Sequence, residues 1–317
     1  MSLLPVSPAH ELAVRPEQQC WLVEDLWADE AVGIIGGEPK SGKSFLALDM
    51  AVAVASGTPC LRRYAVLRPG RVLLYAAEDA LHVVRRRLDG ICHTAGVNLD
   101  AIDVQVITAP VVRLDLNADQ QSLAETVAHI RPTLLVLDPF VRLHRVDENA
   151  SQQVAPLLAF LRQLQRMHHL AVVVVHHARK GAGNTRAGQA LRGSSEFHAW
   201  GDSNLYLRRK GEHLTLTIEH RAAPGASGIP LRLEADGDAL ALQIPDPSSR
   251  PEPAVELTPR QRVEHALSGA IKPLPFRTLR ETCRIRTATL CEELSLMTGR
   301  GQVHKTADGY LLADCGD

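Results

Sequence analysis

The residues with the clearest chemical meaning form one short run near the start of the chain. Residues 37–44 read Gly-Glu-Pro-Lys-Ser-Gly-Lys-Ser, which matches the phosphate-loop pattern GxxxxGK[ST] at every fixed position. In such a loop, backbone N–H groups and a helix N-terminus surround phosphates. Lys43 is expected to reach the β- and γ-phosphates of ATP, and the Ser44 hydroxyl is expected to bind Mg²⁺. The residues predicted to contact the nucleotide are Gly37, Glu38, Pro39, Lys40, Ser41, Gly42, Lys43, Ser44 and Phe45.

A second candidate metal ligand ends an aliphatic run. Asp138 follows the residues Leu-Leu-Val-Leu at 134–137. A carboxylate at the carboxyl end of a parallel strand lies where ligands bind in α/β proteins. We therefore expect Asp138 to lie on the magnesium side of the site. The alternative is that Asp138 only caps the turn that begins at Pro139.

The elements that must position these residues alternate between strands and helices. The aliphatic runs are continuous, which is typical of parallel strands buried on both faces. The expected strands are 31–35, 71–75, 104–108, 133–138, 171–176 and 204–207, and the expected helices include 44–56, 118–129 and 151–167. This order predicts an α/β fold with a largely parallel central sheet and helices on both sides.

The pattern changes after residue 208. Three short apolar runs separated by Gly, Pro and Asp predict hairpins that extend the sheet or form its edge. A proline-rich stretch then predicts an extended linker. The last sixty residues predict three helices and a small hairpin, the element order of a winged helix. The predicted organisation is an α/β domain at 1–246 (with a lead-in at 1–30), a linker at 247–258 and a winged-helix-like domain at 259–317.

Composition excludes several classes of protein. Thirty-five Lys and Arg oppose 36 Asp and Glu in 317 residues, and 45% of residues are hydrophobic. These values exclude a disordered chain, a collagen-like fibre and a uniformly basic nucleic-acid coat. The aliphatic runs are far shorter than the ~20 residues of a membrane-spanning helix. Six scattered cysteines form no CxxC pair, and the start of the chain lacks a signal-peptide pattern. We therefore expect a cytoplasmic protein with reduced thiols and no membrane association.

Five runs in a fixed order carry a family resemblance. They are GEPKSGKS, VLLYAAEDA, LLVLDPF, VVVVHHARKG and RGSSEFHAWGDSNLYLRR. Over about residues 18–210 the chain resembles the RecA-like core of hexameric plasmid replicative helicases of the RepA type. The resemblance implies a phosphate-loop ATPase that assembles as a homo-hexamer. It also implies action on single-stranded DNA, together with other replication proteins.

The resemblance also implies roles for two strand-end residues. Glu78 follows the strand at 71–75 and takes the position of the carboxylate that orients and deprotonates the attacking water. The alternative is that Glu78 or Asp79 only caps the following helix. Neighbouring residues of a strand face opposite sides, so only one of His176 and His177 can face the nucleotide. We expect His177 to sense the γ-phosphate, with His176 as the alternative.

Two loops carry the basic residues that the resemblance places in a central channel. One follows Asp138 and the other follows His177, and the second has many glycines and no acidic residue. Such a loop suits contact with the backbone phosphates of a flexible single strand, although a solvated surface loop remains the alternative. The predicted nucleic-acid contacts are Arg142, Arg145, Arg179, Lys180 and Arg186.

A basic group follows the strand at 203–207. In the resembling helicases, a side chain at this place completes the neighbouring subunit's site and neutralises charge on the γ-phosphate. We expect Arg208 to have this role, with Arg209 and Lys210 as alternatives.

Three functions are compatible with these residues. The first is a helicase ring that moves on single-stranded DNA, and the second is an ATPase of the same class that loads or regulates without unwinding. The third is a small-molecule kinase, which Glu78 and the two basic loops argue against. The C-terminal region fits either duplex DNA or a protein partner.

Overall fold

The computed structural model describes residues 4, 6–12, 14, 16, 20–177, 196–237, 239–245, 258–268, 272–283 and 285–313. The chain divides into two compact units, Met1–Pro245 and Asp246–Asp317. Each unit has a hydrophobic core of its own. That the units correspond to independently folding domains with the predicted boundaries stays a prediction.

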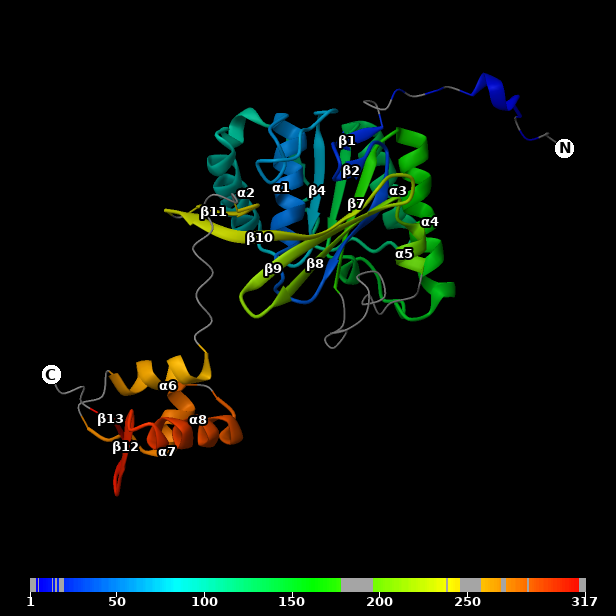
Figure 1. Ribbon diagram of the computed structural model, residues 1–317. Helices are drawn as coiled ribbons and strands as arrows, with labels where there is room; N and C mark the ends of the chain where they lie inside the picture. The colour runs from blue at the N-terminus through cyan, green and yellow to red at the C-terminus, as the bar shows by residue number, and fades with distance from the viewer. Residues whose placement is uncertain are drawn as a thin grey trace. The chain divides into compact units, whose positions relative to one another are not determined.

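A sheet of nine strands forms the centre of the first unit (Figure 1). Its order is β11-β10-β9-β8-β3-β7-β6-β4-β5. The strands are β3 (Val32–Gly37), β4 (Val72–Ala76), β5 (Val104–Val106), β6 (Leu134–Asp138), β7 (Ala171–His177), β8 (Ser203–Lys210), β9 (His213–His220), β10 (Ala226–Asp236) and β11 (Ala239–Gln243). Strands β3 to β8 pair in parallel, whereas β8 to β11 form antiparallel hairpins. The predicted α/β fold with a largely parallel sheet is confirmed.

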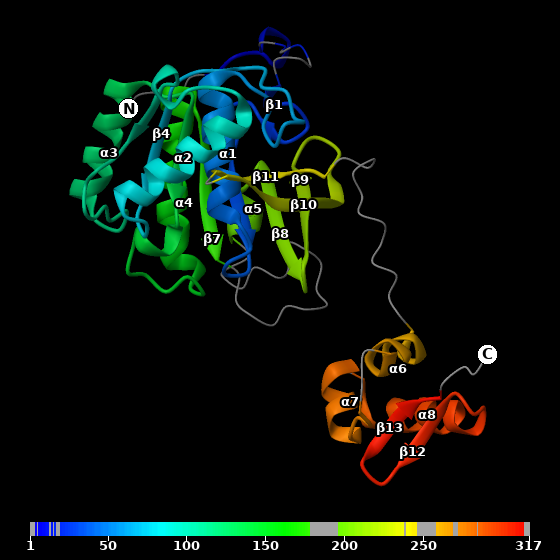
Figure 2. The ribbon, with the colours of Figure 1, turned by 90° about the vertical axis from the view of Figure 1, so that its left-hand side faces the viewer.

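Helices cover both faces of this sheet, which explains why its central strands are aliphatic throughout. The helices are α1 (Lys43–Ser56), α2 (Leu81–Ala95), α3 (Asn117–Ile130), α4 (Ser151–His168) and α5 (Glu196–Trp200). Helices α1 and α2 share one core cluster with one face of the sheet, and α3, α4 and α5 share a second cluster with the other. Figure 1 shows the two groups of helices on opposite sides of the strands, and Figure 2 looks onto the side that carries α1 and α2.

Smaller elements complete the first unit. They are η1 (Ala9–Glu11), β1 (Trp21–Val23), β2 (Trp27–Ala28), η3 (Leu99–Ala101) and η4 (Phe140–Arg142). Strands β1 and β2 pair with each other, and Trp27 is fully buried in the core shared with α1. None of the helices among the described residues combines the length and the apolar character needed to cross a bilayer.

Parallel pairing brings several strand ends to one edge of the sheet. Gly37 at the end of β3 lies opposite His177 at the end of β7. Ala76 at the end of β4 lies opposite Asp138 at the end of β6. The phosphate loop and the segments after β4, β6 and β7 therefore leave the sheet at the same edge, where α/β proteins bind ligands.

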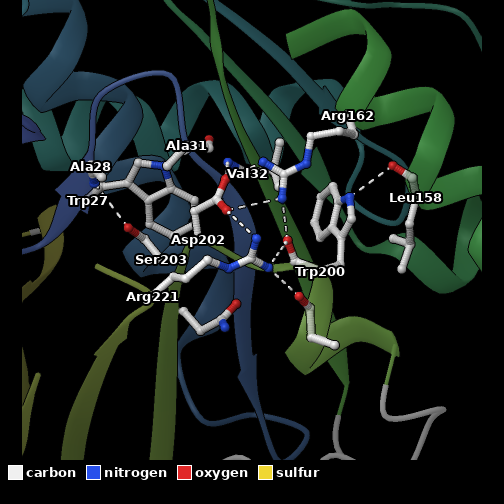
Figure 3. A network of polar contacts seen from close by, with 12 residues as sticks. Trp27, Ala28, Ala31, Val32, Leu158, Arg162, Trp200, Asp202, Ser203 and Arg221 are labelled. Carbon is white, nitrogen blue, oxygen red and sulfur yellow. Dashed lines mark hydrogen bonds and ion pairs between the residues drawn. The ribbon is translucent and has the colours of Figure 1, made fainter. Parts of the chain in front are cut away.

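A polar network at the opposite edge holds β8 against β3 (Figure 3). The Asp202 carboxylate accepts a hydrogen bond from the Val32 backbone N–H at 3.2 Å and pairs with Arg162 of α4. Arg221 also reaches this carboxylate, at 3.4 Å. Trp200 at the end of α5 donates its indole N–H to a backbone carbonyl of α4 at 2.9 Å. A partly buried carboxylate with two guanidinium partners fixes the start of β8, and so the place where β8 ends beside the phosphate loop.

The second unit consists of three helices followed by a hairpin. Its elements are α6 (Pro259–Ser268), α7 (Phe276–Cys283), α8 (Thr287–Gly299), β12 (Val303–Thr306) and β13 (Gly309–Leu312). Side chains of all three helices and of β12 form one small core. Leu274 pairs with Tyr310 of β13, which adds a short bridge to the hairpin. The element order is the predicted one, and its assignment as a winged helix stays a prediction.

Candidate nucleotide-binding site

The phosphate loop connects β3 to α1 and needs glycine at both ends. Gly42 has φ +91° and Gly37 has φ +154°. A Cβ atom on Gly37 would lie 2.4 Å from the carbonyl oxygen of Leu207 in β8. Larger residues at Gly37 would therefore push β8 away from the loop. The Ser41 hydroxyl is buried in this loop without a hydrogen-bond partner, which fits a ligand that carries acceptor oxygens.

Lys43 begins α1 and is almost completely buried, with 3% of its surface exposed. Its ammonium group donates a hydrogen bond to the Glu38 carbonyl across the loop at 2.7 Å. Burial lowers the pKa of Lys43 to about 8, although the charges of Asp138, Glu78 and Glu38 raise it. A phosphate in the loop would offer this buried ammonium a charged hydrogen-bond acceptor in place of the neutral Glu38 carbonyl.

Ser44 and Asp138 meet at the carboxyl end of β6. Asp138 is 7% exposed, and burial raises its pKa to about 6 while a hydrogen bond from Ser44 lowers it. A hydroxyl and a carboxylate are oxygen ligands of the kind that Mg²⁺ prefers, alongside waters and phosphate oxygens. The turn after β6 begins at Pro139 with no side-chain cap, so the alternative role of Asp138 as a cap finds no support.

Glu78 lies two residues beyond β4, on the same side as Lys43. Its carboxylate is close enough to act on the pKa values of both Lys43 and Asp138. Glu78 Oε1 accepts a hydrogen bond from Arg142 Nε at 2.8 Å. Helix α2 begins after Ala80 without a side-chain cap, so neither Glu78 nor Asp79 caps it. Asp79 instead pairs with Arg87 of α2.

The two histidines at the end of β7 face different surroundings. His177 is half-buried and lies beside the phosphate loop, where burial and the charge of Lys43 lower its pKa. His176 is 1% exposed and contacts the ring of Phe197, with ring centroids 4.2 Å apart. This arrangement favours His177 over His176 as the residue that meets a nucleotide.

A cavity of about 280 Å³ lies over the phosphate loop. Its lining residues are Lys40, Ser41, Gly42, Lys43, Ser44, Phe45, Arg87, His177, Arg209, Leu233 and Leu242. The loop supplies its polar part, and Phe45, Leu233 and Leu242 supply an apolar part. The guanidinium of Arg87 lies 5.2 Å from the centre of the Phe45 ring. Sequence analysis missed Arg87, Leu233 and Leu242, because no local motif marks them and two of them come from the hairpin strands.

Arg208 and Arg209 lie near the end of β8 and face opposite sides of the sheet. Leu205 and Leu207 belong to the core on the α1 side, whereas Tyr206 belongs to the core on the α4 side. Alternation along the strand continues this pattern. Arg209 accordingly lines the cavity of its own chain, and Arg208 lies on the other face of β8. The structure therefore places the sequence alternative, Arg209, nearer the phosphate loop than Arg208.

The predicted nucleic-acid residues are only partly covered by the structure. Arg142 and Arg145 are both exposed in the segment after β6. Arg179, Lys180 and Arg186 lie outside the described residues. Among the described residues, no group of three or more His, Cys, Asp or Glu side chains could hold a metal ion by itself.

Comparison with protein families decides the class of this chain. The AAA domain family matches residues 2–183, more than half of the sequence. The chain belongs to the AAA domain family. Its fold is similar to that of a DnaB-like replicative helicase, whose structure was described together with its interactions with primase. That similarity has a TM-score of 0.52 at 14% identity, and it covers 67% of this chain and 57% of the helicase chain.

A second solved structure, the RadB recombinase, matches with a TM-score of 0.49 at 20% identity over 69% of this chain and 92% of the recombinase. The aligned region spans little more than half of the helicase chain's length, 57%. This AAA domain protein thus has the RecA-like phosphate-loop NTPase fold that the sequence predicted. Membership in the family makes it a nucleotide-binding protein of the ATPase type.

Proposed function

We propose that this AAA domain protein is a ring-forming ATPase that moves on single-stranded DNA, as a replicative helicase of a plasmid or mobile element. One observation carries the ATPase part of the proposal. Lys43, Asp138, Glu78 and His177, which lie on four separate segments of the chain, meet at one edge of the sheet beside the phosphate loop. Phosphoryl transfer needs this kind of positioned charge and little covalent chemistry.

Each residue has a distinct task in hydrolysis. Lys43 leaves the Glu38 carbonyl and pairs with the β- and γ-phosphate oxygens. Ser44 and Asp138 would hold Mg²⁺, which neutralises phosphate charge when it is bound. Glu78 orients the attacking water and takes its proton. The His177 imidazole donates a hydrogen bond to a γ-phosphate oxygen.

The apolar part of the cavity supports a purine nucleotide. Leu242 of β11 lies near the loop, since a Cβ atom on Gly42 would be 3.5 Å from its side chain. Phe45, Leu242 and Leu233 offer an apolar surface, and Arg87 offers a planar cation, which together suit a purine base.

Exposed arginines support a nucleic-acid strand near the same edge. Arg142 and Arg145 follow β6 within seven residues of Asp138. Arginine suits phosphate because its planar group donates two parallel hydrogen bonds. In a cytoplasmic homo-hexamer, these residues and the predicted contacts Arg179, Lys180 and Arg186 would face a central channel.

A second function is an ATPase of the same class that loads or regulates other replication proteins without unwinding. It would use the same site residues for ATP hydrolysis, and the contact between Arg142 and Glu78 is compatible with both functions. The kinase alternative has weaker support, since a kinase does not need a water-activating carboxylate at Glu78.

Three measurements test the proposal together. ATP hydrolysis is measured with and without single-stranded DNA, strand separation is measured on forked DNA, and particles with an ATP analogue and Mg²⁺ are imaged by negative stain. Rings, DNA-stimulated hydrolysis and strand separation support the helicase. Stimulated hydrolysis without strand separation supports the loader or regulator. Turnover no faster than that of Lys43→Ala protein would refute the ATPase itself.

A further inference from the structure

The segment that follows Asp138 is anchored to β7 by a partly buried acid, Glu148, which lies between two buried histidines. Glu148 Oε1 lies 3.3 Å from His144 Nε2, and Glu148 Oε2 lies 3.5 Å from His176 Nε2. The side chains of His144 and His176 are 2% and 1% exposed. The ring of Phe140 packs against His144, with centroids 4.6 Å apart. The backbone of this segment is therefore held in place from inside the protein.

The side chain of Arg142 extends from the same segment toward solvent. Its neighbours Phe140 and Leu143 are fully buried, whereas the Arg142 side chain is 62% exposed. Arg142 Nε donates its hydrogen bond to the Glu78 carboxylate, which is itself 41% exposed. Because the backbone is anchored and the side chain is exposed, Arg142 can leave Glu78 without any movement of the segment.

Arg142, which is proposed to bind DNA, thus contacts Glu78, which is proposed to activate water. We propose that Arg142 restrains Glu78 when no strand is bound. A backbone phosphate of single-stranded DNA then binds the Arg142 guanidinium, and the Glu78 carboxylate is released. This inference rests on the proposed function and adds its regulation. While Arg142 holds it, Glu78 has one oxygen occupied and its orientation fixed by the guanidinium, so it cannot present that oxygen to a water molecule.

The strength of the contact suits a reversible restraint. Ion pairs between exposed side chains are weak, and they change an equilibrium by about fivefold at most. A phosphate group competes well for an arginine, since it can accept two parallel hydrogen bonds from the guanidinium. The proposed release therefore needs no large conformational energy. It also predicts a modest degree of restraint, which an activity assay can resolve.

The test compares Arg142→Ala, Arg142→Lys and wild-type protein in ATP hydrolysis, each with and without single-stranded DNA. Arg142→Ala should raise the DNA-free rate by roughly two- to fivefold, the range expected for loss of an exposed ion pair. DNA should then give little further stimulation. Arg142→Lys keeps the charge but lacks the planar group, so its DNA-free rate should lie between the other two. Arg166→Ala, which removes an exposed arginine of α4, is the matched control and should keep the wild-type rate and stimulation.

Two further variants separate the possible failures. Glu78→Gln combined with Arg142→Ala should stay inactive, because the released group is then not a base. An unchanged or lower DNA-free rate in Arg142→Ala protein that still folds and binds ATP would overturn the inference and leave the ATPase proposal intact. Full DNA stimulation of Arg142→Ala would overturn it as well.

ATP itself could also remove the restraint, in which case wild type and Arg142→Ala would turn over equally without DNA. The phosphate that binds Arg142 would then belong to the nucleotide, and the inference would fail. Wild-type turnover no faster than that of Lys43→Ala would refute both proposals.

Discussion

The backbone of His177 lies opposite that of Gly37 in the parallel pairing of β7 with β3. This register places the histidine beside the first residue of the phosphate loop, and the charge of Lys43 reaches its imidazole. Binding or loss of a γ-phosphate would therefore change the surroundings of His177 at the end of β7. The next residue, His176, contacts Glu148 of the segment that follows Asp138.

Lys43→Ala should abolish ATP hydrolysis. The substitution removes the ammonium group that donates to the Glu38 carbonyl across the loop. The positive charge expected at the β- and γ-phosphates is lost with it. We expect a loss of at least about 10²–10³ in kcat, the range seen when one stabilising group is removed from a transition state. Steady-state hydrolysis measures the loss, and an unchanged unfolding temperature shows that the fold survives. Near-normal turnover would refute the ATPase assignment.

Glu78→Gln should keep ATP binding but slow hydrolysis by about 10²–10⁴, the usual contribution of a general base. The amide has nearly the same shape, so only the base function is removed. Equilibrium binding of a fluorescent ATP analogue and single-turnover hydrolysis distinguish the two effects. Glu125→Gln is the matched control, because Glu125 is an exposed acid of α3, on the other side of the sheet from α1. Lost nucleotide binding in Glu78→Gln would make Glu78 a structural residue.

Arg209→Ala and Arg208→Ala should differ in the step that they affect. Arg209 lines the cavity of its own chain, so its removal should weaken ATP binding. Arg208 lies on the other face of β8 and, as the proposed contact to a neighbouring subunit, should leave binding intact and slow hydrolysis. Titration of an ATP analogue measures the first effect, and turnover of assembled protein measures the second.

Mixed rings test the shared site. Arg208→Ala protein mixed with Lys43→Ala protein should regain part of the activity, because an intact Lys43 of one subunit then meets an intact Arg208 of its neighbour. If subunits exchange and no activity returns, Arg208 has no part in the neighbouring site.

Glu148→Gln should destabilise the first unit near neutral pH and matter less in acid. Burial alone would raise the pKa of Glu148, but contacts with His144 and His176 lower it to about 2. A carboxyl whose pKa is lower in the folded state stabilises the fold above its unfolded pKa, and this contribution is lost as pH falls toward the folded value. The expected cost is about 2–3 kcal/mol above pH 5 and shrinks between pH 4.5 and 2.

Urea unfolding at pH 6 and pH 3.5 measures this difference, with Glu125→Gln as a control for an exposed acid of α3. An equal difference between Glu148→Gln and wild type at both pH values would show that the Glu148 charge does not stabilise the anchored segment.

The sequence alone determined the parts of the site that lie on contiguous residues. The phosphate loop, its helix and the strand that ends in Asp138 each combine within a few residues all that their geometry needs. Continuous aliphatic runs likewise predicted a sheet buried on both faces. The order β3-β7-β6-β4-β5 is set instead by how the crossover helices pack, and no run of residues encodes it.

Only the tertiary structure decided the contacts between distant segments. Sequence reasoning chose Arg208 for the γ-phosphate of a neighbouring subunit, with Arg209 as an alternative, and this choice stays a prediction. The structure adds that alternation along β8 turns Arg209 toward the phosphate loop of its own chain. Leu242 reaches the cavity because the hairpins β9 to β11 fold back over α1 and α2, which no local pattern marks. The meeting of Arg142 with Glu78, 64 residues apart, depends on the parallel pairing of β4 with β6. Residue spacing along a chain sets which side chains share a strand or helix face, whereas strand order and register set which faces meet.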